Sequence, residues 1–121
     1  MRNISFAKTI EQVRARQKTV TRRIGWRWLK EGTLLRPVEK AMGLKKGERI
    51  QPIFNDGTCI RVVSVGIECL SAIQHQHGEP AREGFPNMST DDFIAFFQRE
   101  LGASLDTVLT VIEFEYVEVV R

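Results

Sequence analysis

Cysteine, proline and long apolar runs are scarce in this sequence of 121 residues. The two cysteines, Cys59 and Cys69, lack a metal-binding spacing and are too few to staple a fold, so we expect reduced residues of strands. No apolar run approaches the roughly 20 residues that a membrane-spanning helix needs. The N-terminus, MRNISFAKTIEQ, lacks the apolar core of a signal peptide, which favours a cytoplasmic protein. These absences leave a soluble globular protein, and 42% hydrophobic and 27% charged residues are typical of that class.

The length predicts one domain over residues 1–121, and its net charge of +3 conceals a sharp division. Residues 1–49 carry fourteen Lys and Arg against four Glu, a net charge of +10. Residues 50–121 carry four Arg against eleven Asp and Glu, a net charge of −7. Such asymmetry predicts a basic surface for an anionic partner such as nucleic acid or a nucleotide. Two milder interpretations remain: the halves neutralise each other across the fold, or the lysines aid solubility.

Apolar patterning predicts an α+β fold with about five or six mostly antiparallel strands and two or three helices. Strands are expected at 3–7, 18–23, 34–38, 50–54, 59–70 and 107–120, and a helix at 9–17 with Thr9 as its cap. Residues 25–33 form a turn or a short helix that ends near Gly32, and 39–50 and 71–88 are loops. Asp56-Gly57 is a strong turn signal that predicts a hairpin between 50–54 and 59–70. Strands of these lengths suit a partly closed barrel.

A second helix is predicted from Ser89 or Thr90, which cap it, to Gly102, which ends it. Asp91 and Asp92 lie in its first turn, where the helix dipole favours carboxylates. The apolar residues of this helix are expected to form one buried face, made of Phe93, Ile94, Phe96, Phe97 and Leu101.

Four short stretches carry a resemblance to a known family. KTVTRR at 18–23, GTLL at 32–35, EGF at 83–85 and VIEFEYV at 111–117 occur in the order typical of the ASCH family. The sequence resembles this family, part of the PUA-like superfamily, over nearly its whole length. It is most similar to short ASCH proteins of bacteria and phages. The resemblance implies a PUA-like β-barrel with a cleft between residues 18–23 and the 83–85 loop, which in ASCH proteins is thought to bind RNA or a nucleoside.

One branch of that family removes the acetyl group of N4-acetylcytidine with a lysine, a threonine three residues later and a glutamate in a later loop. The resemblance assigns these roles to Lys18, Thr21 and Glu83, with Glu79 competing for the third. This sequence departs from that branch by the extra segment 39–49 and by the pair Trp26 and Trp28.

The chemistry of such a site sets conditions on these residues. A threonine hydroxyl becomes a useful nucleophile only when a base takes its proton, and Lys18 serves only if its pKa falls from about 10.4. Nearby arginines would lower that pKa, whereas Glu83 either relays protons or holds Lys18 charged. On a regular strand Lys18 and Thr21 face opposite sides, so they meet only if Lys18 precedes the strand or a bulge intervenes. Otherwise, threonines 19 and 21 are ordinary strand residues among solvated cations.

Further residues are candidates for ligand contacts. Arg22 and Arg23 face opposite sides of a strand, so at most one is expected in the cleft, with Lys45 and Lys46 as further phosphate contacts. Trp26 and its neighbour Trp28 stack on a base or cover one end of the barrel. The remaining cleft residues in this prediction are Gly84 and Phe85.

His75 and His77 have a spacing that can chelate zinc, but no third ligand is evident at a useful distance. We expect no metal and no other cofactor. The first functional hypothesis is an ASCH domain that binds RNA or a modified nucleoside. The alternative is an N4-acetylcytidine amidohydrolase with the same site, and the third is a protein–protein interaction module.

Overall fold

The computed structural model describes residues 1–119, so the last residue of the strand predicted at 107–120 and the end of the predicted domain lie outside it. Strands and short helices alternate along the chain. The elements are β1 (Arg2–Ser5), α1 (Ile10–Arg14), β2 (Val20–Arg23), β3 (Leu34–Val38), β4 (Thr58–Cys69), the 3-10 helix η1 (Leu70–His75), α2 (Glu79–Arg82), α3 (Thr90–Leu101) and β5 (Val108–Glu118). No helix within residues 1–119 is both long and apolar enough to cross a membrane.

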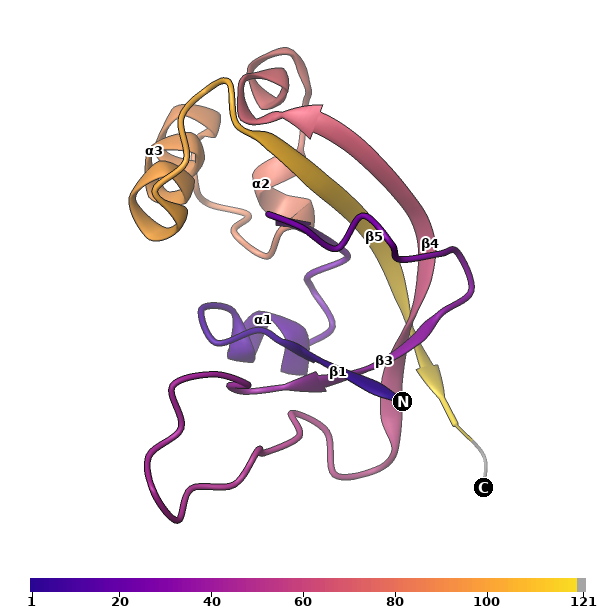
Figure 1. The fold of residues 1–121 in the computed structure, drawn as a ribbon. Helices are drawn as coiled ribbons and strands as arrows, with labels where there is room; N and C mark the ends of the chain where they lie inside the picture. The colour runs from indigo at the N-terminus through magenta and orange to yellow at the C-terminus, as the bar shows by residue number, and fades with distance from the viewer. Residues whose placement is uncertain (120–121) are drawn as a thin grey trace.

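The five strands form one mixed sheet in the order β1-β3-β4-β5-β2. Only β1 and β3 pair in parallel, and the other neighbours are antiparallel. The long strands β4 and β5 make a curved ribbon that runs the length of the molecule (Figure 1). The predicted α+β class is confirmed, but β1 and β2 remain sheet edges and the barrel is open. A hydrogen bond from the Arg23 guanidinium to the Ser5 carbonyl links these two edges.

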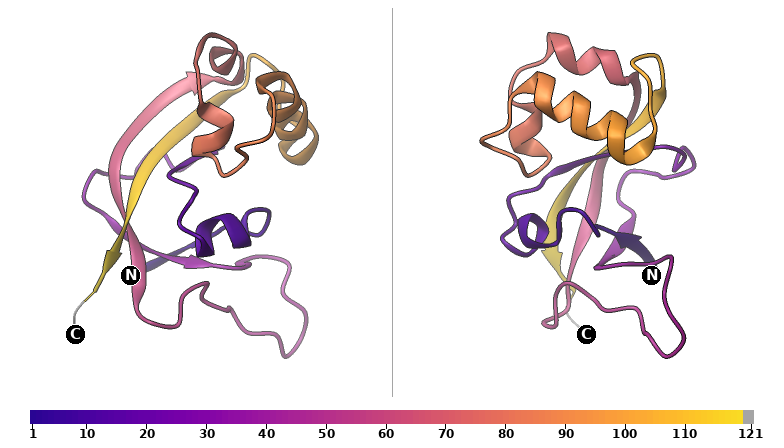
Figure 2. Two further views of the ribbon diagram at one scale, coloured as in Figure 1. Left: turned by 180° about the vertical axis from the view of Figure 1, so that it is seen from behind. Right: turned by 90° about the vertical axis from the view of Figure 1, so that its left-hand side faces the viewer.

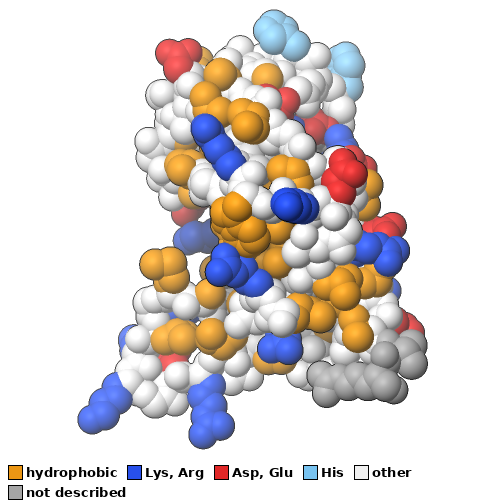
Figure 3. Space-filling model, turned by 45° about the vertical axis from the view of Figure 1, so that its right-hand side comes forward, with side chains coloured by type: hydrophobic (Ala, Val, Ile, Leu, Met, Phe, Trp, Pro, Cys, Tyr) orange, Lys and Arg blue, Asp and Glu red, His pale blue; other side chains and the backbone are white. Residues whose placement is uncertain are grey.

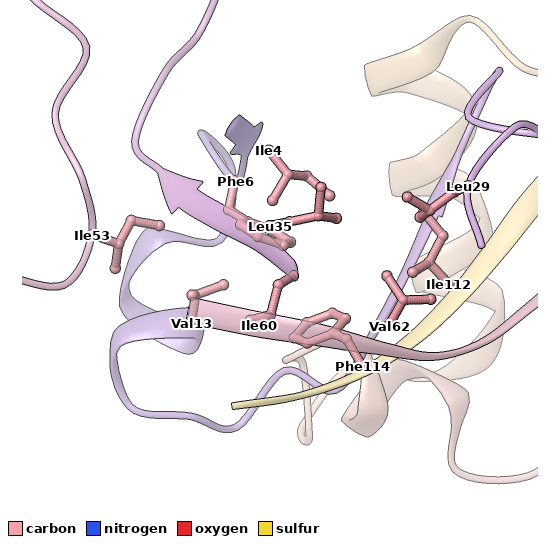
Figure 4. Close-up of a cluster of buried hydrophobic side chains, with 10 residues drawn as sticks. All are labelled: Ile4, Phe6, Val13, Leu29, Leu35, Ile53, Ile60, Val62, Ile112 and Phe114. Carbon is pink, nitrogen blue, oxygen red and sulfur yellow. The ribbon is translucent and has the colours of Figure 1, made fainter. Parts of the chain in front are cut away.

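Two apolar clusters lie along this ribbon. The larger cluster packs α1 against the sheet, and Figure 4 shows its side chains pointing toward one another. The second joins η1, α3 and β5 and includes Leu70, Ile73, Phe93 and Leu109. In both views of Figure 2, α2, α3 and η1 gather at one end of the ribbon and α1 lies nearer the other. The candidate site forms beside α3 and the segment that precedes α1.

The prediction for α3 is largely confirmed. The Ser89 hydroxyl accepts a hydrogen bond from the Asp92 N–H at 3.1 Å, and Gly102 ends the helix with a φ of +62°. Phe93, Ile94 and Phe97 are buried, but Phe96 is half-buried and Leu101 is 43% exposed. The buried stripe is therefore narrower than predicted, because Phe96 and Leu101 border a cavity rather than the apolar cluster.

The predicted hairpin across Asp56-Gly57 is wrong. Residues 50–54 form no strand; their backbone pairs with the described sheet only through an isolated bridge between Pro52 and Val38, and Ile53 joins the larger apolar cluster. The main partner of β4 is β5, with pairs from Thr58–Glu118 to Cys69–Val108. Asp56 instead makes a local turn, in which its Oδ1 accepts a hydrogen bond from the Thr58 N–H at 2.9 Å.

Two smaller predictions also need correction. The stretch 71–88 is not one long loop, because it contains most of η1 and all of α2. The Thr9 side chain makes no capping hydrogen bond at the start of α1, which has five residues. Residues 25–33 contain turns, which is one of the two alternatives that the sequence predicted. Cys59 and Cys69 are free thiols on β4.

Candidate functional site

Lys18 lies before β2 rather than on it, so it satisfies the condition that the sequence set for its approach to Thr21. Its N–H donates to the Gln12 carbonyl of α1 at 3.3 Å, and β2 begins only at Val20. Both Lys18 and Thr21 are buried, and they line the same cavity.

Gly84 brings the turn after α2 against α1. Its φ is +102°, in a region that favours glycine, and a Cβ built on it would lie 2.8 Å from the Gln12 Cβ. The same Cβ would lie 3.5 Å from the Lys18 Cβ. Only a residue without a side chain permits this approach, which delivers Glu83 to Lys18.

Lys18 and Glu83 form a buried ion pair. Lys18 Nζ lies 2.6 Å from Glu83 Oε1 and donates a second hydrogen bond to the Glu83 carbonyl at 2.9 Å. Their exposed fractions are 4% and 2%. Two residues 65 positions apart in the sequence therefore meet in the interior of the protein.

Arg22 also pairs with Glu83, and with two further carboxylates of this region. Its Nη1 donates to Glu83 Oε2 at 3.0 Å, and its Nη2 contacts Glu79 and Glu68. Arg82 provides a second cation for Glu79, at 2.9 Å. Burial would lower the pKa of Arg22, but the surrounding carboxylates outweigh it and raise the value. Glu83 is the carboxylate at Lys18, whereas Glu79 belongs to the supporting network.

Burial lowers the pKa of Lys18 below its ordinary value of 10.5, although the charge of Glu83 and its hydrogen bond act to raise it. Arg23 and Arg22 add a smaller lowering. The neutral amine is therefore more accessible at Lys18 than at a lysine in solvent.

Arg23 contributes a cation without a carboxylate partner in the described part of the chain. Its Nε donates to the Thr21 hydroxyl at 3.3 Å, and its guanidinium lies over the rings of Phe6 and Trp26 at 5.0 and 5.6 Å. Burial lowers the pKa of Arg23 to about 10. A positive charge is thus held directly beside the threonine.

These groups surround a cavity of about 360 Å³ between the edge of β2, the segment after β1, and α3. Lys18, Thr21, Arg22, Arg23 and Glu83 lie along it. The expectation that at most one of the two arginines reaches the cleft is wrong, because the cavity follows a sheet edge and both residues border it, although the side chain of Arg22 is held by carboxylates. Its other walls are largely aromatic: Phe6, Trp26, Phe85, Phe93, Phe96 and Phe97.

The tryptophan pair forms a stack at the cavity wall. Trp26 is half-buried and lines the cavity, and its ring stacks on Trp28 with centroids 5.4 Å apart. Trp28 is 53% exposed, and Arg2 lies 4.6 Å from the centre of its ring. Trp26 has a φ of +61°, which is uncommon for a bulky residue and costs conformational energy.

Lys45 and Lys46 do not border this cavity. They belong to the 39–50 loop, which lies at the opposite end of the molecule from α2 and α3 (Figure 1). On the face in Figure 3, Lys and Arg side chains are scattered among hydrophobic and acidic ones rather than gathered in one basic patch. His75 and His77 are both exposed, and residues 1–119 contain no cluster of three potential metal ligands.

Sequence reasoning missed part of this site. Residues 5–9 border the cavity but were not predicted as site residues. Phe93 and Phe96 also border it, whereas the sequence predicted them only as part of the buried face of a helix. Glu68, at the far end of β4, was not predicted either, although a carboxylate near the end of an apolar strand indicates a polar partner. Of the two residues that follow Glu83 in the EGF motif, Phe85 borders the cavity and Gly84 does not.

The sequence matches no family model and no curated protein. Two solved structures share its fold. A protein from Enterococcus faecalis V583, of the family DUF984, aligns with a TM-score of 0.61 and 19% identity over 91% of this chain and 67% of that one. An ASCH domain from Lactobacillus crispatus JV V101 aligns with a TM-score of 0.51 and 16% identity over 90% of this chain and 70% of that one.

Proposed function

Because the chain has an ASCH-like fold, we propose that it binds a nucleoside, free or as one unit of RNA, in the cavity beside β2. The observation that carries this proposal is the convergence of Lys18, Thr21 and Glu83 on one aromatic-walled cavity of about 360 Å³. Cavities of roughly 300–1,000 Å³ with apolar walls and a few convergent polar groups are typical of small-molecule sites. Aromatic rings suit the flat faces of a base, and the polar groups suit its edges.

The charges of the site favour a nucleoside over a long strand. Lys18 and Arg22 are paired with carboxylates, and Lys8 at the cavity is 3.3 Å from Glu100. Only Arg23, of the described cations that border the cavity, lacks such a partner. One remaining charge accommodates at most about one phosphate, so the affinity is expected to change little with salt.

Calorimetric titration with cytidine and N4-acetylcytidine tests this function at about 50 and 500 mM salt. We expect Phe85→Ala to weaken binding about tenfold, the equivalent of roughly 1.4 kcal/mol for a lost stacking contact. Phe54→Ala is the matched control, because Phe54 packs against the other apolar cluster. Absence of binding by either nucleoside refutes the proposal. An RNA oligonucleotide that binds more tightly than either nucleoside, with an affinity that falls steeply with salt, replaces the nucleoside with an RNA strand as ligand.

A specific observation favours a second function, hydrolysis of N4-acetylcytidine. The lowered pKa of Lys18 makes its neutral amine accessible, and Arg23 holds a positive charge next to the Thr21 hydroxyl. A neutral Lys18 amine keeps two hydrogens, which it donates to Glu83 Oε1 and to the Glu83 main-chain carbonyl. Its lone pair is then available to accept the threonine proton. Base, nucleophile and a cation for a developing oxyanion are thus present in one cavity.

In this reaction Thr21 Oγ1 attacks the acetyl carbon while its proton moves to Lys18 Nζ. The carbonyl oxygen becomes an oxyanion, which the Arg23 guanidinium stabilises. Cleavage of the C–N4 bond returns the proton from Lys18 to N4 and releases cytidine. Water then hydrolyses the acetyl ester on Thr21, with Lys18 as base, and acetate leaves. Glu83 orients the amine throughout.

Chromatographic conversion of N4-acetylcytidine to cytidine tests the second function. Lys18→Met and Thr21→Val are expected to abolish conversion. Lys45→Met and Thr58→Val are the controls, because Lys45 lies in a distant loop and Thr58 is a buried strand threonine outside the cavity. Intact substrate after incubation with concentrated wild-type protein refutes hydrolysis while leaving nucleoside binding open to the titration above.

A further inference from the structure

The edge of β2 presents unused main-chain groups to the cavity. The Phe114 N–H donates to the Thr19 carbonyl at 2.9 Å, and the register continues with Thr21 opposite Ile112 and Arg22 opposite Val111. In an antiparallel pair, alternate residues direct both N–H and C=O to the partner strand. Thr21, Arg23 and the C=O of Thr19 lie in this phase, so Val20 and Arg22 direct their N–H and C=O groups away from β5.

Arg22 is the residue whose outward groups meet the cavity. It borders the cavity, whereas Val20 does not. Within residues 1–119, no hydrogen bond outside the strand pairs uses the N–H or C=O of Arg22. The side chain of Arg22 is bound to carboxylates. Its main-chain N–H and C=O are the groups that remain available as a hydrogen-bond donor and acceptor.

Where it borders the cavity, the available edge is one residue long, because Val20 does not line the cavity. At its start, the Thr19 N–H donates to the Arg82 carbonyl at 2.8 Å, and Lys18 is bound to Glu83. At its end, the Arg23 guanidinium bridges to the Ser5 carbonyl. A peptide that added a strand to this edge would need several successive free residues. These blocks at both ends leave space for one compact group.

We infer that the base of the bound nucleoside pairs edge-on with the Arg22 main chain, accepting a hydrogen bond from its N–H and donating one to its C=O. This inference rests on the proposed nucleoside-binding function and specifies how the ring is recognised. Cytosine carries N3, an acceptor, next to the N4–H donor, so its edge replaces one residue of a neighbouring strand. N4-acetylcytidine retains N3 and one N4–H, so it fits the same contact.

Three probes test this contact by calorimetry: cytidine, 5-methylcytidine and N4,N4-dimethylcytidine. The dimethyl analogue has lost the N4–H donor and should bind at least tenfold more weakly than cytidine. The 5-methyl analogue adds bulk but keeps both groups, so it should bind within threefold of cytidine. Amide hydrogen exchange measured by NMR should slow at Arg22 and not at Val20 when cytidine saturates the protein.

The outcomes separate this inference from the function on which it rests. Cytidine binding that Phe85→Ala weakens, with equal affinity for the dimethyl analogue and unchanged exchange at Arg22, overturns the edge contact and preserves the nucleoside site. Failure of all three probes to bind overturns both. Protection of Val20 and Arg22 together by an extended peptide of seven residues identifies the edge as a strand-docking site, and likewise overturns the inference.

Discussion

Replacement of Gly84 by alanine tests the claim that contact between the 83–85 turn and α1 builds the site. An alanine at a φ of +102° adopts an unfavourable backbone conformation, which costs about 1–2 kcal/mol. Its Cβ also overlaps Gln12, whose Cβ and Cγ lie at 2.8 and 2.9 Å. The Gln12 Cβ is fixed to the backbone of α1, so the helix must shift. Such overpacking costs about 1–3 kcal/mol.

The expected total loss is about 2–5 kcal/mol, a large part of the roughly 5–15 kcal/mol that stabilises a typical domain. Urea denaturation measures it as a lower midpoint at an unchanged slope. Gly32→Ala is the matched control, because Gly32 has a φ of +83° but no atom within 4 Å of the position that a Cβ would take. We therefore expect Gly32→Ala to lower the free energy of unfolding only by the cost of the unfavourable backbone conformation, about 1–2 kcal/mol.

A double-mutant cycle isolates the overlap. Gln12→Gly removes both atoms that the new methyl group meets, although it weakens α1 by about 0.5–1 kcal/mol. Gly84→Ala combined with Gln12→Gly should therefore lose about 1–3 kcal/mol less than the sum of the single changes. Additive losses, or equal losses for Gly84→Ala and Gly32→Ala, would refute the idea that close packing against α1 positions Glu83.

Other consequences of the site can be measured in the same way. Arg22→Met should lower the free energy of unfolding at pH 7 by about 3–5 kcal/mol, because it leaves buried carboxylates short of a cation. Burial raises the pKa of Glu79 but hydrogen bonds from Arg22 and Arg82 outweigh it, so the value is lowered. The stability from this pairing is present above the ordinary value of 4.5 and is lost as pH falls through the lower folded-state pKa, and urea melts should show a smaller acid loss in Arg22→Met. If the protein hydrolyses N4-acetylcytidine, turnover should rise with pH and level off below 10.5, because burial lowers the pKa of Lys18. Lys45→Gln combined with Lys46→Gln should leave cytidine affinity within twofold in calorimetry, and a tenfold loss would place the 39–50 loop at the ligand.

Sequence reasoning succeeded where local signals agree. The helix α3 combines a serine cap, two early aspartates and a final glycine, and all three signals act within one helix. The alternation along β5 is equally local, with Ile112 and Phe114 buried and Glu115 exposed. Such features require no knowledge of the partner that the element will meet.

The hairpin prediction failed because strand pairing is decided by distant partners. Asp56-Gly57 turns the chain, but the turn only introduces β4, and the segment before it contains Pro52. The longest pairing in the protein joins β4 to β5, which lies far along the chain from it. The short helix α2 was missed because four residues show no apolar period; Gly78 and Pro80 at its start were interpreted as loop formers.

The candidate site followed from the resemblance rather than from spacing. Counting along a strand correctly places Lys18 and Thr21 on opposite faces of a regular strand, but β2 starts two residues after Lys18. The same counting assigned Arg22 and Arg23 to opposite faces, and their side chains do contact different groups, but both residues border the cavity because β2 is a sheet edge. Whether a strand is central or at an edge depends on the whole topology, which no short motif contains.

The division of charge between the two halves of the chain acquires a physical explanation from this topology. The basic 1–49 region supplies Lys18 and Arg22, and the acidic region supplies Glu68, Glu79 and Glu83, so the largest concentration of opposite charge is buried as ion pairs. Breaking such pairs is costly, but forming them adds little net stability over apolar packing. Their retention at a cavity is therefore better explained by the control of an amine and a carboxylate than by stability. A cleft built in this way is nearly neutral, and shape, aromatic stacking and an unpaired strand edge must then select the ligand.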